Sequence, residues 1–314
     1  MPRWERGKDA DKFTVTDILS GQSSGFFLVE TDFEIMTAAL RYNFSTARQL
    51  VILLDGRAAK RDVQRRLAIL HNYGLVERLW GIYRTTPMPV SLPDGSIGTK
   101  DKRIKEYIFA LSQKGFDLLV RSENEYAVAW QGNWQPKAWS SSRKNSLMHE
   151  LGRNDVCLAM LQALRVLGRP AIDWRGPREA FHRYVPPAPG AAAILAEPDS
   201  VLILDNGRPL FVEYERSGRP ERFYRKLINM RTYIASNGWK QRYLGSPWIV
   251  YAIPVGLGTQ KVTSGTYGGL VHQAVMGNAM RYLLLDQTSW ETGSWDAVRS
   301  DGSIVSLWKT VLSD

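Results

Sequence analysis

Two apolar segments that flank a short polar loop constrain the fold of this chain most strongly. Residues 200–204 read Ser-Val-Leu-Ile-Leu and residues 210–212 read Leu-Phe-Val, with Asp205-Asn206-Gly207 in the stretch between them. Branched and aromatic residues favour β-strands, and a glycine in the loop can take the positive φ that a tight turn requires. The pattern predicts a β-hairpin with carboxylates near its open end, because Pro198-Asp199 precedes the first strand and Glu213-Tyr214-Glu215 follows the second.

The length of the loop decides whether these carboxylates meet. A two-residue Asn206-Gly207 turn would place Asp199 opposite Tyr214 and leave Glu213 on the other face. A three-residue loop with Gly207 in the left-handed conformation pairs Asp199 with Glu213 instead. We favour the three-residue loop, in which the same face also carries Val201, Phe211 and Glu215.

Carboxylates this close together point to a divalent metal ion. They repel one another, and a hard cation with oxygen ligands is the usual solution. A further carboxylate is available upstream, where residues 146–164 have apolar residues at helical spacing and carry Glu150 and Asn154 one turn apart on a single face. We therefore predict a Mg²⁺ or Mn²⁺ site with Glu150, Asp199, Glu213 and Glu215 as ligands. The alternative is a set of polar residues at a solvated strand end.

The elements around the hairpin follow a definite order. Pro220 can begin a second helix, in which Lys226 and Tyr233 are seven residues apart and share a face. Residues 248–253 read as a buried strand, and residues 169–174 can supply a short one before the hairpin. The predicted order is helix, strand, strand, strand, helix, strand.

That order, with an acid on the first helix, Pro198-Asp199 on the second strand and Glu213 on the third, resembles the PD-(D/E)xK restriction-endonuclease-like fold. The resemblance implies metal-dependent cleavage of DNA by Glu150, Asp199, Glu213, Glu215 and Lys226. The chain departs from the motif because Glu215 stands where that superfamily usually has lysine. Arg216 or Lys226 could replace the missing lysine, or Glu215 could be an additional metal ligand.

The N-terminal third of the chain predicts a winged helix-turn-helix. Helices are expected at residues 32–40, at 47–54 behind an N-cap at Ser45 or Thr46, and at 58–72. A strand follows residues 74–80, then a Pro/Gly-rich loop from Pro87 to Lys100, a returning strand around residues 107–111 and a closing helix that begins near Gln113.

The third of these helices carries the basic residues expected of a DNA reader. Val63, Leu67 and Leu70 form its inward stripe, and a solvated basic face is the alternative interpretation. In the wing, Lys102 and Arg103 belong to a second basic cluster that could lie along phosphates. The basic residues of the predicted reading helix are Arg57, Lys60, Arg61, Arg65 and Arg66.

Composition favours a polyanionic partner and a reducing compartment. The formal net charge is +10, and phosphate contacts dominate non-specific affinity for nucleic acid. Cys157 is the one cysteine, so an internal disulfide and a Cys/His zinc site are excluded. No apolar run approaches membrane-spanning length and the first residues lack a secretory apolar stretch, which predicts a soluble cytoplasmic protein without membrane contact. A phosphate loop ending in Lys-Ser or Lys-Thr is also missing, so nucleotide hydrolysis is not expected.

These features predict an α+β protein (α/β in its second half) with four parts. Residues 1–23 form an N-terminal arm, 24–122 the winged helix-turn-helix domain, 123–145 a linker and 146–314 the nuclease-like domain. The linker contains Trp130, Trp134 and Trp139, which can pack against one domain or stack on single-stranded DNA. Double-stranded DNA is the main expected partner, and a homodimer is left open.

Taken together, the winged helix, residues 149–155, Pro198-Asp199, residues 211–215 and residues 226–233 resemble the replication-relaxation family of plasmid and mobile-element proteins. The resemblance implies a role in replication or mobilisation of extrachromosomal DNA, in which acidic residues nick or cut DNA. Two alternatives remain. A non-catalytic replication initiator or transcriptional regulator would use the nuclease-like domain as a scaffold, and a defence endonuclease would share the chemistry on another target.

Overall fold

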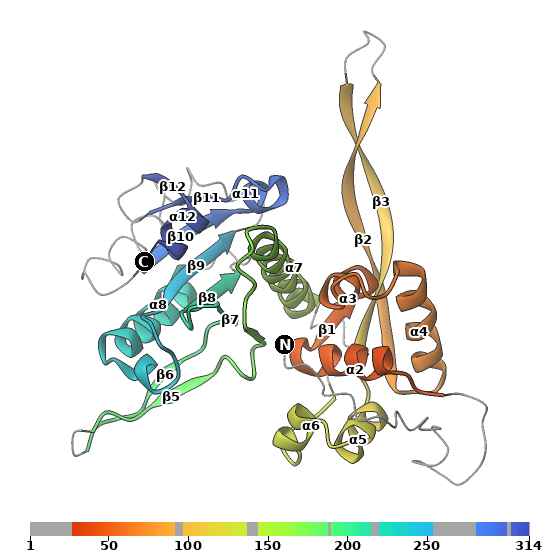
Figure 1. The fold of residues 1–314 in the computed structure, drawn as a ribbon, viewed down its shortest axis with the longest axis horizontal. Helices are drawn as coiled ribbons and strands as arrows, with labels where there is room; N and C mark the ends of the chain where they lie inside the picture. Colours follow the sequence, from red (N-terminus) through yellow and green to blue (C-terminus); the bar gives the residue numbers. More distant parts are fainter. Residues whose placement is uncertain are drawn as a thin grey trace. The chain divides into compact units, whose positions relative to one another are not determined.

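The protein is an α+β protein that forms two compact units, dividing between Leu147 and Met148. The computed structural model describes residues 27–91, 97–136, 144–187, 190–214, 220–253, 281–299 and 303–313. In this part of the chain, no helix combines the length and the apolar composition that crossing a bilayer requires. Each unit has its own sheet and its own helices (Figure 1).

In its described part, the N-terminal unit begins with the three predicted helices. They are α2 (Glu30–Tyr42), α3 (Ala47–Leu53) and α4 (Lys60–Asn72), with the short strand β1 (Phe44–Thr46) before α3. Thr46 caps α3 as predicted: its Oγ1 accepts from the Gln49 amide at 3.3 Å, and Gln49 Oε1 accepts from the Thr46 amide at 3.0 Å. This reciprocal pair satisfies donors at the helix start, which explains why α3 begins where it does.

A long hairpin follows the helices and differs from the prediction. Strands β2 (Val76–Ser91) and β3 (Ile97–Leu111) pair over most of their length and project from the helices of their unit (Figure 1). The loop predicted from Pro87 to Lys100 is therefore wrong, since both strands continue into it. The sheet order β1-β3-β2 makes β2 an edge strand. Proline has no N–H to donate, so it is tolerated on an edge strand where its nitrogen faces the side without a neighbouring strand. Pro87 and Pro89 are two residues apart, so their nitrogens face the same side of β2.

Two more helices complete this unit. Helix α5 (Gln113–Arg121) is capped by Ser112, whose Oγ accepts from the Gly115 amide at 3.0 Å, and α6 (Glu125–Trp130) follows it. Trp134 stacks on Phe116 with ring centroids 4.3 Å apart, and the Arg41 guanidinium lies 4.1 Å from the ring centre of Tyr126. Residues 124–134, predicted as part of a linker, are thus packed on the N-terminal unit.

The C-terminal unit is built on a seven-stranded mixed sheet of order β12-β11-β10-β9-β8-β7-β4. Strands β8, β9 and β10 run parallel to one another, whereas the outer neighbours pair antiparallel. The strands are β4 (Asp173–Arg175), β7 (Ser200–Ile203), β8 (Pro209–Tyr214), β9 (Trp248–Ile253), β10 (Arg281–Asp286), β11 (Asp296–Val298) and β12 (Ile304–Ser306). The predicted sequence of helix, three strands, helix and strand is present, with the hairpin of β5 (His182–Tyr184) and β6 (Ile194–Ala196) inserted before β7.

The central hairpin has the predicted register. Val201 pairs with Phe211 and Ser200 with Val212, which places Asp199 and Glu213 at the next opposing positions. Leu204 N donates to Arg208 O at 2.9 Å, so the loop consists of Asp205, Asn206 and Gly207. Gly207 has φ +75°, the left-handed value that a three-residue loop needs at this position.

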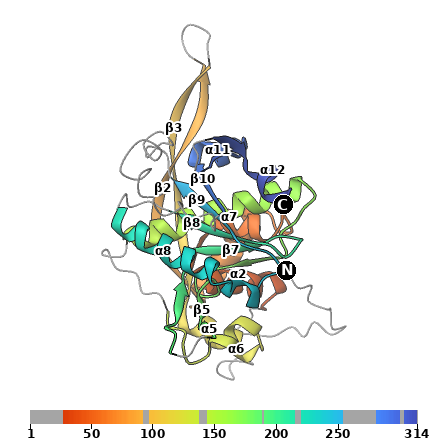
Figure 2. The same cartoon turned by 90° about the vertical axis from the view of Figure 1, so that its left-hand side faces the viewer.

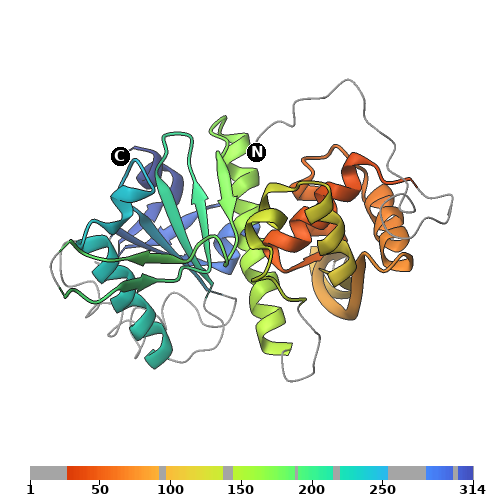
Figure 3. The ribbon, with the colours of Figure 1, turned by 90° about the horizontal axis from the view of Figure 1, so that it is seen from below.

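Helices cover both faces of this sheet. Helix α8 (Pro220–Ala235) packs Leu227, Met230 and Tyr233 against β7, β8 and β9 on one face (Figure 2). Helix α7 (Lys144–Val166) lies on the opposite face (Figure 3), where Gly152 faces the ring of Tyr214. Shorter helices, η2 (Gly238–Gln241), α11 (Gln287–Thr292) and α12 (Leu307–Leu312), follow later in the chain.

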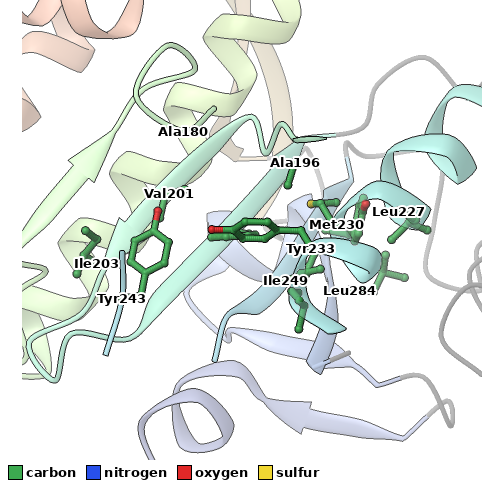
Figure 4. Packing of buried hydrophobic residues seen from close by; sticks show 13 residues of the cluster. Ala180, Ala196, Val201, Ile203, Leu227, Met230, Tyr233, Tyr243, Ile249 and Leu284 are labelled. Carbon is green, nitrogen blue, oxygen red and sulfur yellow. The ribbon is translucent and has the colours of Figure 1, made fainter. Parts of the chain in front are cut away.

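The core under α8 contains a buried histidine that the sequence did not predict. His182 packs against both Phe211 and Tyr233, with its ring centroid 5.3 Å from each of theirs. Tyr233 and Tyr243 also belong to the cluster of buried hydrophobic residues between α8 and the sheet, which Figure 4 shows. Arg242 donates to His182 Nδ1 at 2.9 Å, and because a guanidinium only donates, Nε2 carries the proton and donates to the Tyr243 hydroxyl at 3.1 Å.

His182 is therefore held in its neutral form. Burial, together with the positive charges of Arg242 and Arg175, lowers its pKa from 6.5 to about 3. The unfolded chain takes up this proton below about pH 6.5, whereas the folded protein resists it. The stabilisation that neutral His182 provides is fully present above pH 6.5, the pKa of histidine in the unfolded chain. It is lost as the pH falls toward about 3, the pKa of His182 in the folded protein.

The variant His182→Phe keeps an aromatic ring in the stack but has nothing to protonate. Between about pH 7 and about pH 5, the wild-type free energy of unfolding should fall by about 2 kcal/mol more than that of the variant. Urea unfolding followed by tryptophan fluorescence at both pH values measures this difference. Parallel pH dependences in the two proteins would show that His182 is not held neutral.

Candidate functional site

Asp199 and Glu213 meet at the open end of the β7–β8 hairpin. The Asp199 amide donates to Glu213 Oε1 at 3.2 Å, and the Tyr214 amide donates to Asp199 Oδ2 at 2.9 Å. Both carboxylates are thus fixed by the backbone of the opposing strand. Only 4% of the Glu213 side chain and 15% of the Asp199 side chain are exposed. A buried pair of acids needs a compensating positive charge.

Lys226 provides that charge from helix α8. Its Nζ donates to Asp199 Oδ1 at 2.6 Å and also donates to Glu213 Oε2. Leu227, Met230 and Tyr233 anchor the helix to the sheet, and they bring Lys226 to the strand end. The shared face predicted for Lys226 and Tyr233 is confirmed, because both reach the same face of the hairpin.

His149 approaches Asp199 from helix α7, on the other side of the sheet. Its Nε2 lies 3.2 Å from Asp199 Oδ2, and its ring centre is 5.7 Å from that of Tyr214. Gly152 permits this approach, because a Cβ at that position would overlap the Tyr214 ring. The cluster therefore joins the first helix, both hairpin strands and the second helix of the C-terminal unit.

Burial and neighbouring charges shift the pKa values of the two carboxyl groups in opposite directions. For Asp199, burial alone would raise the pKa, but the charge of Lys226 and the hydrogen bond from His149 hold the pKa well below its usual range. For Glu213, burial and the neighbouring charge of Asp199 raise the pKa well above its usual range, despite Lys226. The pKa of Lys226 is raised by both acids even though burial opposes this. Lys226 is therefore a firmly held cation.

Glu150 lies close in sequence to His149 but does not complete a metal cage. It is 7% exposed, and its charge partly offsets the burial that lowers the pKa of Arg178. Within the described ranges, no three His, Cys, Asp or Glu side chains gather as ligands for one ion. Glu215, the fourth predicted ligand, falls outside those ranges, as does Arg216. The residues brought together are thus Asp199, Glu213, Lys226 and His149.

The donor chemistry of this cluster still suits a hard divalent ion. Mg²⁺ commonly takes one or two protein carboxylates and completes its shell with water and substrate phosphate. Asp199 and Glu213 supply two such carboxylates, which converge on the Lys226 ammonium. They could hold Mg²⁺ or Mn²⁺ only if that ammonium moved aside.

In the N-terminal unit, two of the predicted DNA-binding arginines form ion pairs with acids of α2, Arg66 with a buried one and Arg57, whose side chain is 53% exposed, at the surface. Arg66 forms a bidentate pair with Asp32, whose side chain is 0% exposed, through Nε at 2.7 Å and through Nη2. Arg57 Nη1 pairs with Glu34 Oε1 at 2.6 Å. Both acids belong to α2, so these arginines tie the region around α4 to the first helix.

The remaining basic residues of α4 are exposed. They are Lys60, Arg61 and Arg65, and the contact of Arg65 with Asp62, at 3.8 Å, is a weak surface pair. Lys102 and Arg103 lie on β3, opposite Thr86 and Thr85 of β2. The structure thus separates Arg66, which is held against a buried acid of α2, from Lys60, Arg61 and Arg65, which are exposed on α4.

Sequence reasoning missed these structural ion pairs and the buried His182. The partner of Arg66 is 34 residues away, and no local pattern connects the two. The short strand β5 around His182 offers only three residues, too few to show a period. Lys226 was predicted because its helical spacing from Tyr233 was visible in the sequence.

Comparison with protein-family models matches residues 40–247 to the family described as Replication-relaxation. The match covers more than half of the 314-residue chain, including α4, the β7–β8 hairpin and Lys226. No curated protein and no solved structure matches the chain.

Proposed function

Because the chain belongs to the replication-relaxation family, we propose that it acts on DNA during replication or mobilisation of a plasmid or another mobile element. Membership of the family suggests such a role and an interaction with DNA. The observation that supports a catalytic role is the convergence of Asp199, Glu213 and Lys226 at one strand end. The proposed activity is metal-dependent nicking or cutting of a DNA strand.

In this proposal the N-terminal unit docks on duplex DNA as a winged helix. Its elements run helix, strand, helix, helix and long hairpin, with exposed basic residues on α4. Lys60, Arg61 and Arg65 would contact phosphates near the major groove, and the β2–β3 hairpin would reach along the backbone with Lys102 and Arg103. Arg66 is assigned to the packing of α2 instead, and Arg57 pairs with Glu34 at the surface.

The catalytic residues are those of the strand-end cluster. Asp199 and Glu213 would hold Mg²⁺ or Mn²⁺, which supplies an acidified water and neutralises phosphate charge when bound. Lys226 would donate to a non-bridging oxygen of the phosphate, where charge develops as the water oxygen bonds to phosphorus and the sugar oxygen leaves. His149 holds the second oxygen of Asp199 and so positions that carboxylate. Lys226 would thus take the role of the lysine that Glu215 replaces.

A non-catalytic scaffold is the second candidate function. It is favoured by the ion pairs of Lys226, because this ammonium already neutralises Asp199 and Glu213 without any metal. In that case the C-terminal unit would support a replication initiator or a transcriptional regulator. The two candidates differ in whether DNA is cut.

Plasmid cleavage separates the candidates. Supercoiled plasmid with Mn²⁺ should be converted by the wild type to open-circular or linear DNA, and Glu213→Gln should lower the rate at least about a hundredfold because one metal-binding oxygen is replaced by an amide. Glu291→Gln, a change at an exposed position of α11, serves as the matched control, and EDTA should stop the reaction. Equal rates in wild type and Glu213→Gln would remove this cluster from the chemistry.

The contrast between the exposed Arg61 and Arg65 and the buried pair of Arg66 with Asp32 gives a separate prediction for DNA binding. Arg61→Ala with Arg65→Ala should weaken binding to duplex DNA and reduce the slope of log K against log salt by about 2, since each lost phosphate contact accounts for about 0.9. Arg66→Ala should instead lower the free energy of unfolding by about 3 kcal/mol, because Asp32 is left buried without its partner.

Fluorescence anisotropy across a salt series and urea unfolding measure the two effects. Arg121→Ala, at the exposed end of α5, controls for loss of positive charge alone. An unchanged salt slope in the Arg61/Arg65 variant would show that this face of α4 does not contact DNA.

A further inference from the structure

The position of Lys226 affects how a divalent ion can bind to Asp199 and Glu213. This inference rests on the proposed metal-dependent function. We propose that Lys226 and a divalent ion compete for the same two carboxylates, so that a DNA phosphate, by drawing the ammonium away, promotes metal binding. The protein without DNA would then hold its site closed with its own side chain. Metal and phosphodiester would bind cooperatively.

The geometry supports competition between Lys226 and the ion for the same carboxylate oxygens, rather than an effect of Lys226 at a distance. Lys226 Nζ donates to Asp199 Oδ1 at 2.6 Å and to Glu213 Oε2, the oxygens that face each other across the strand end. The other oxygens are already engaged, because Asp199 Oδ2 accepts from the Tyr214 amide and Glu213 Oε1 accepts from the Asp199 amide. Asp199 Oδ2 also lies 3.2 Å from His149 Nε2, so Asp199 Oδ1 and Glu213 Oε2 are the oxygens that the backbone and His149 leave for an ion, and an ion that approaches them would be repelled by the Lys226 ammonium.

Lys226 leaves this position at a lower cost when another anion receives it. Its side chain is 29% exposed, whereas the Asp199 and Glu213 side chains that it bridges are 15% and 4% exposed, so the lysine has a way out to solvent that the two acids lack. A phosphate oxygen is a strong acceptor for an ammonium group. Binding of DNA thus offers Lys226 a new partner at the same moment as it offers the ion a further ligand. By linkage, Mn²⁺ must then tighten DNA binding by the same factor by which DNA tightens Mn²⁺ binding.

The test is a titration with Mn²⁺ followed by the electron paramagnetic resonance signal of the free ion. Wild-type protein is titrated alone and with a short duplex, and Lys226→Met is titrated in the same two conditions. The duplex binds some Mn²⁺ by itself, so Glu213→Gln with the duplex provides the background. Lys240→Met, a change at an exposed lysine of the same unit, controls for loss of charge.

Competition predicts that the duplex tightens Mn²⁺ binding to the wild type by about tenfold, a typical size for coupling between sites. Lys226→Met should bind Mn²⁺ about tenfold more tightly than the wild type without DNA, and the duplex should tighten its Mn²⁺ binding less than it does for the wild type, because only the phosphate ligand is then gained. Lys226→Met should nevertheless cut plasmid more slowly, because it binds the ion but lacks the group that contacts phosphate. The wild-type comparison with and without duplex needs no variant, so it holds even if Lys226→Met folds poorly.

Two contrary results are distinguishable. If the wild type binds Mn²⁺ equally with and without duplex and Lys226→Met binds it no more tightly, competition is overturned, whereas metal-dependent cleavage by the wild type would still support the proposed function. If neither protein binds Mn²⁺ above the Glu213→Gln background in any condition, the inference and the metal-dependent function both fail.

Discussion

The C-terminal unit depends on one electrostatic constraint, which is the placement of two acids side by side at the end of a buried hairpin. Like charges about 4 Å apart near a protein surface repel by about 4 kcal/mol, a large part of the net stability of a domain, about 5–15 kcal/mol. The Lys226 ammonium offsets this repulsion by donating to both Asp199 and Glu213. The register of β7 and β8, the packing of α8 and the approach of α7 through His149 all serve to bring these groups together.

The need to neutralise Asp199 and Glu213 connects the stability of the C-terminal unit with its proposed function. A site that must be neutralised when no ligand is present can use a metal ion, a protonated acid or a side-chain cation. Here the pKa of Glu213 is raised and that of Asp199 is lowered, so the acids are no longer equivalent and Lys226 is the permanent cation. The same arrangement can be a resting state of an enzyme or the final state of a scaffold. What distinguishes the two is whether Lys226 gives way when a phosphate arrives.

Parts of this structure could be predicted from the sequence because they depend on local rules. Gly207 in a short polar loop predicted a tight turn of two or three residues, and the favoured three-residue turn, which the structure has, pairs Asp199 with Glu213. Thr46, one of the two predicted N-cap residues, marked the start of α3 in the same way. By contrast, Pro87 and Pro89 were misread as a loop, because their tolerance depends on β2 being an edge strand, which is a property of the whole sheet. The pairing of Arg66 with Asp32 also depends on tertiary packing.

The most direct test of the central claim is a crystal structure of the protein with duplex DNA and Mn²⁺, analysed for anomalous scattering from manganese. Our interpretation predicts a manganese peak at coordination distance from the carboxylates of Asp199 and Glu213, with Lys226 turned away from them toward a phosphate. A DNA-bound structure in which Lys226 still bridges the two carboxylates and no manganese lies beside them would contradict it.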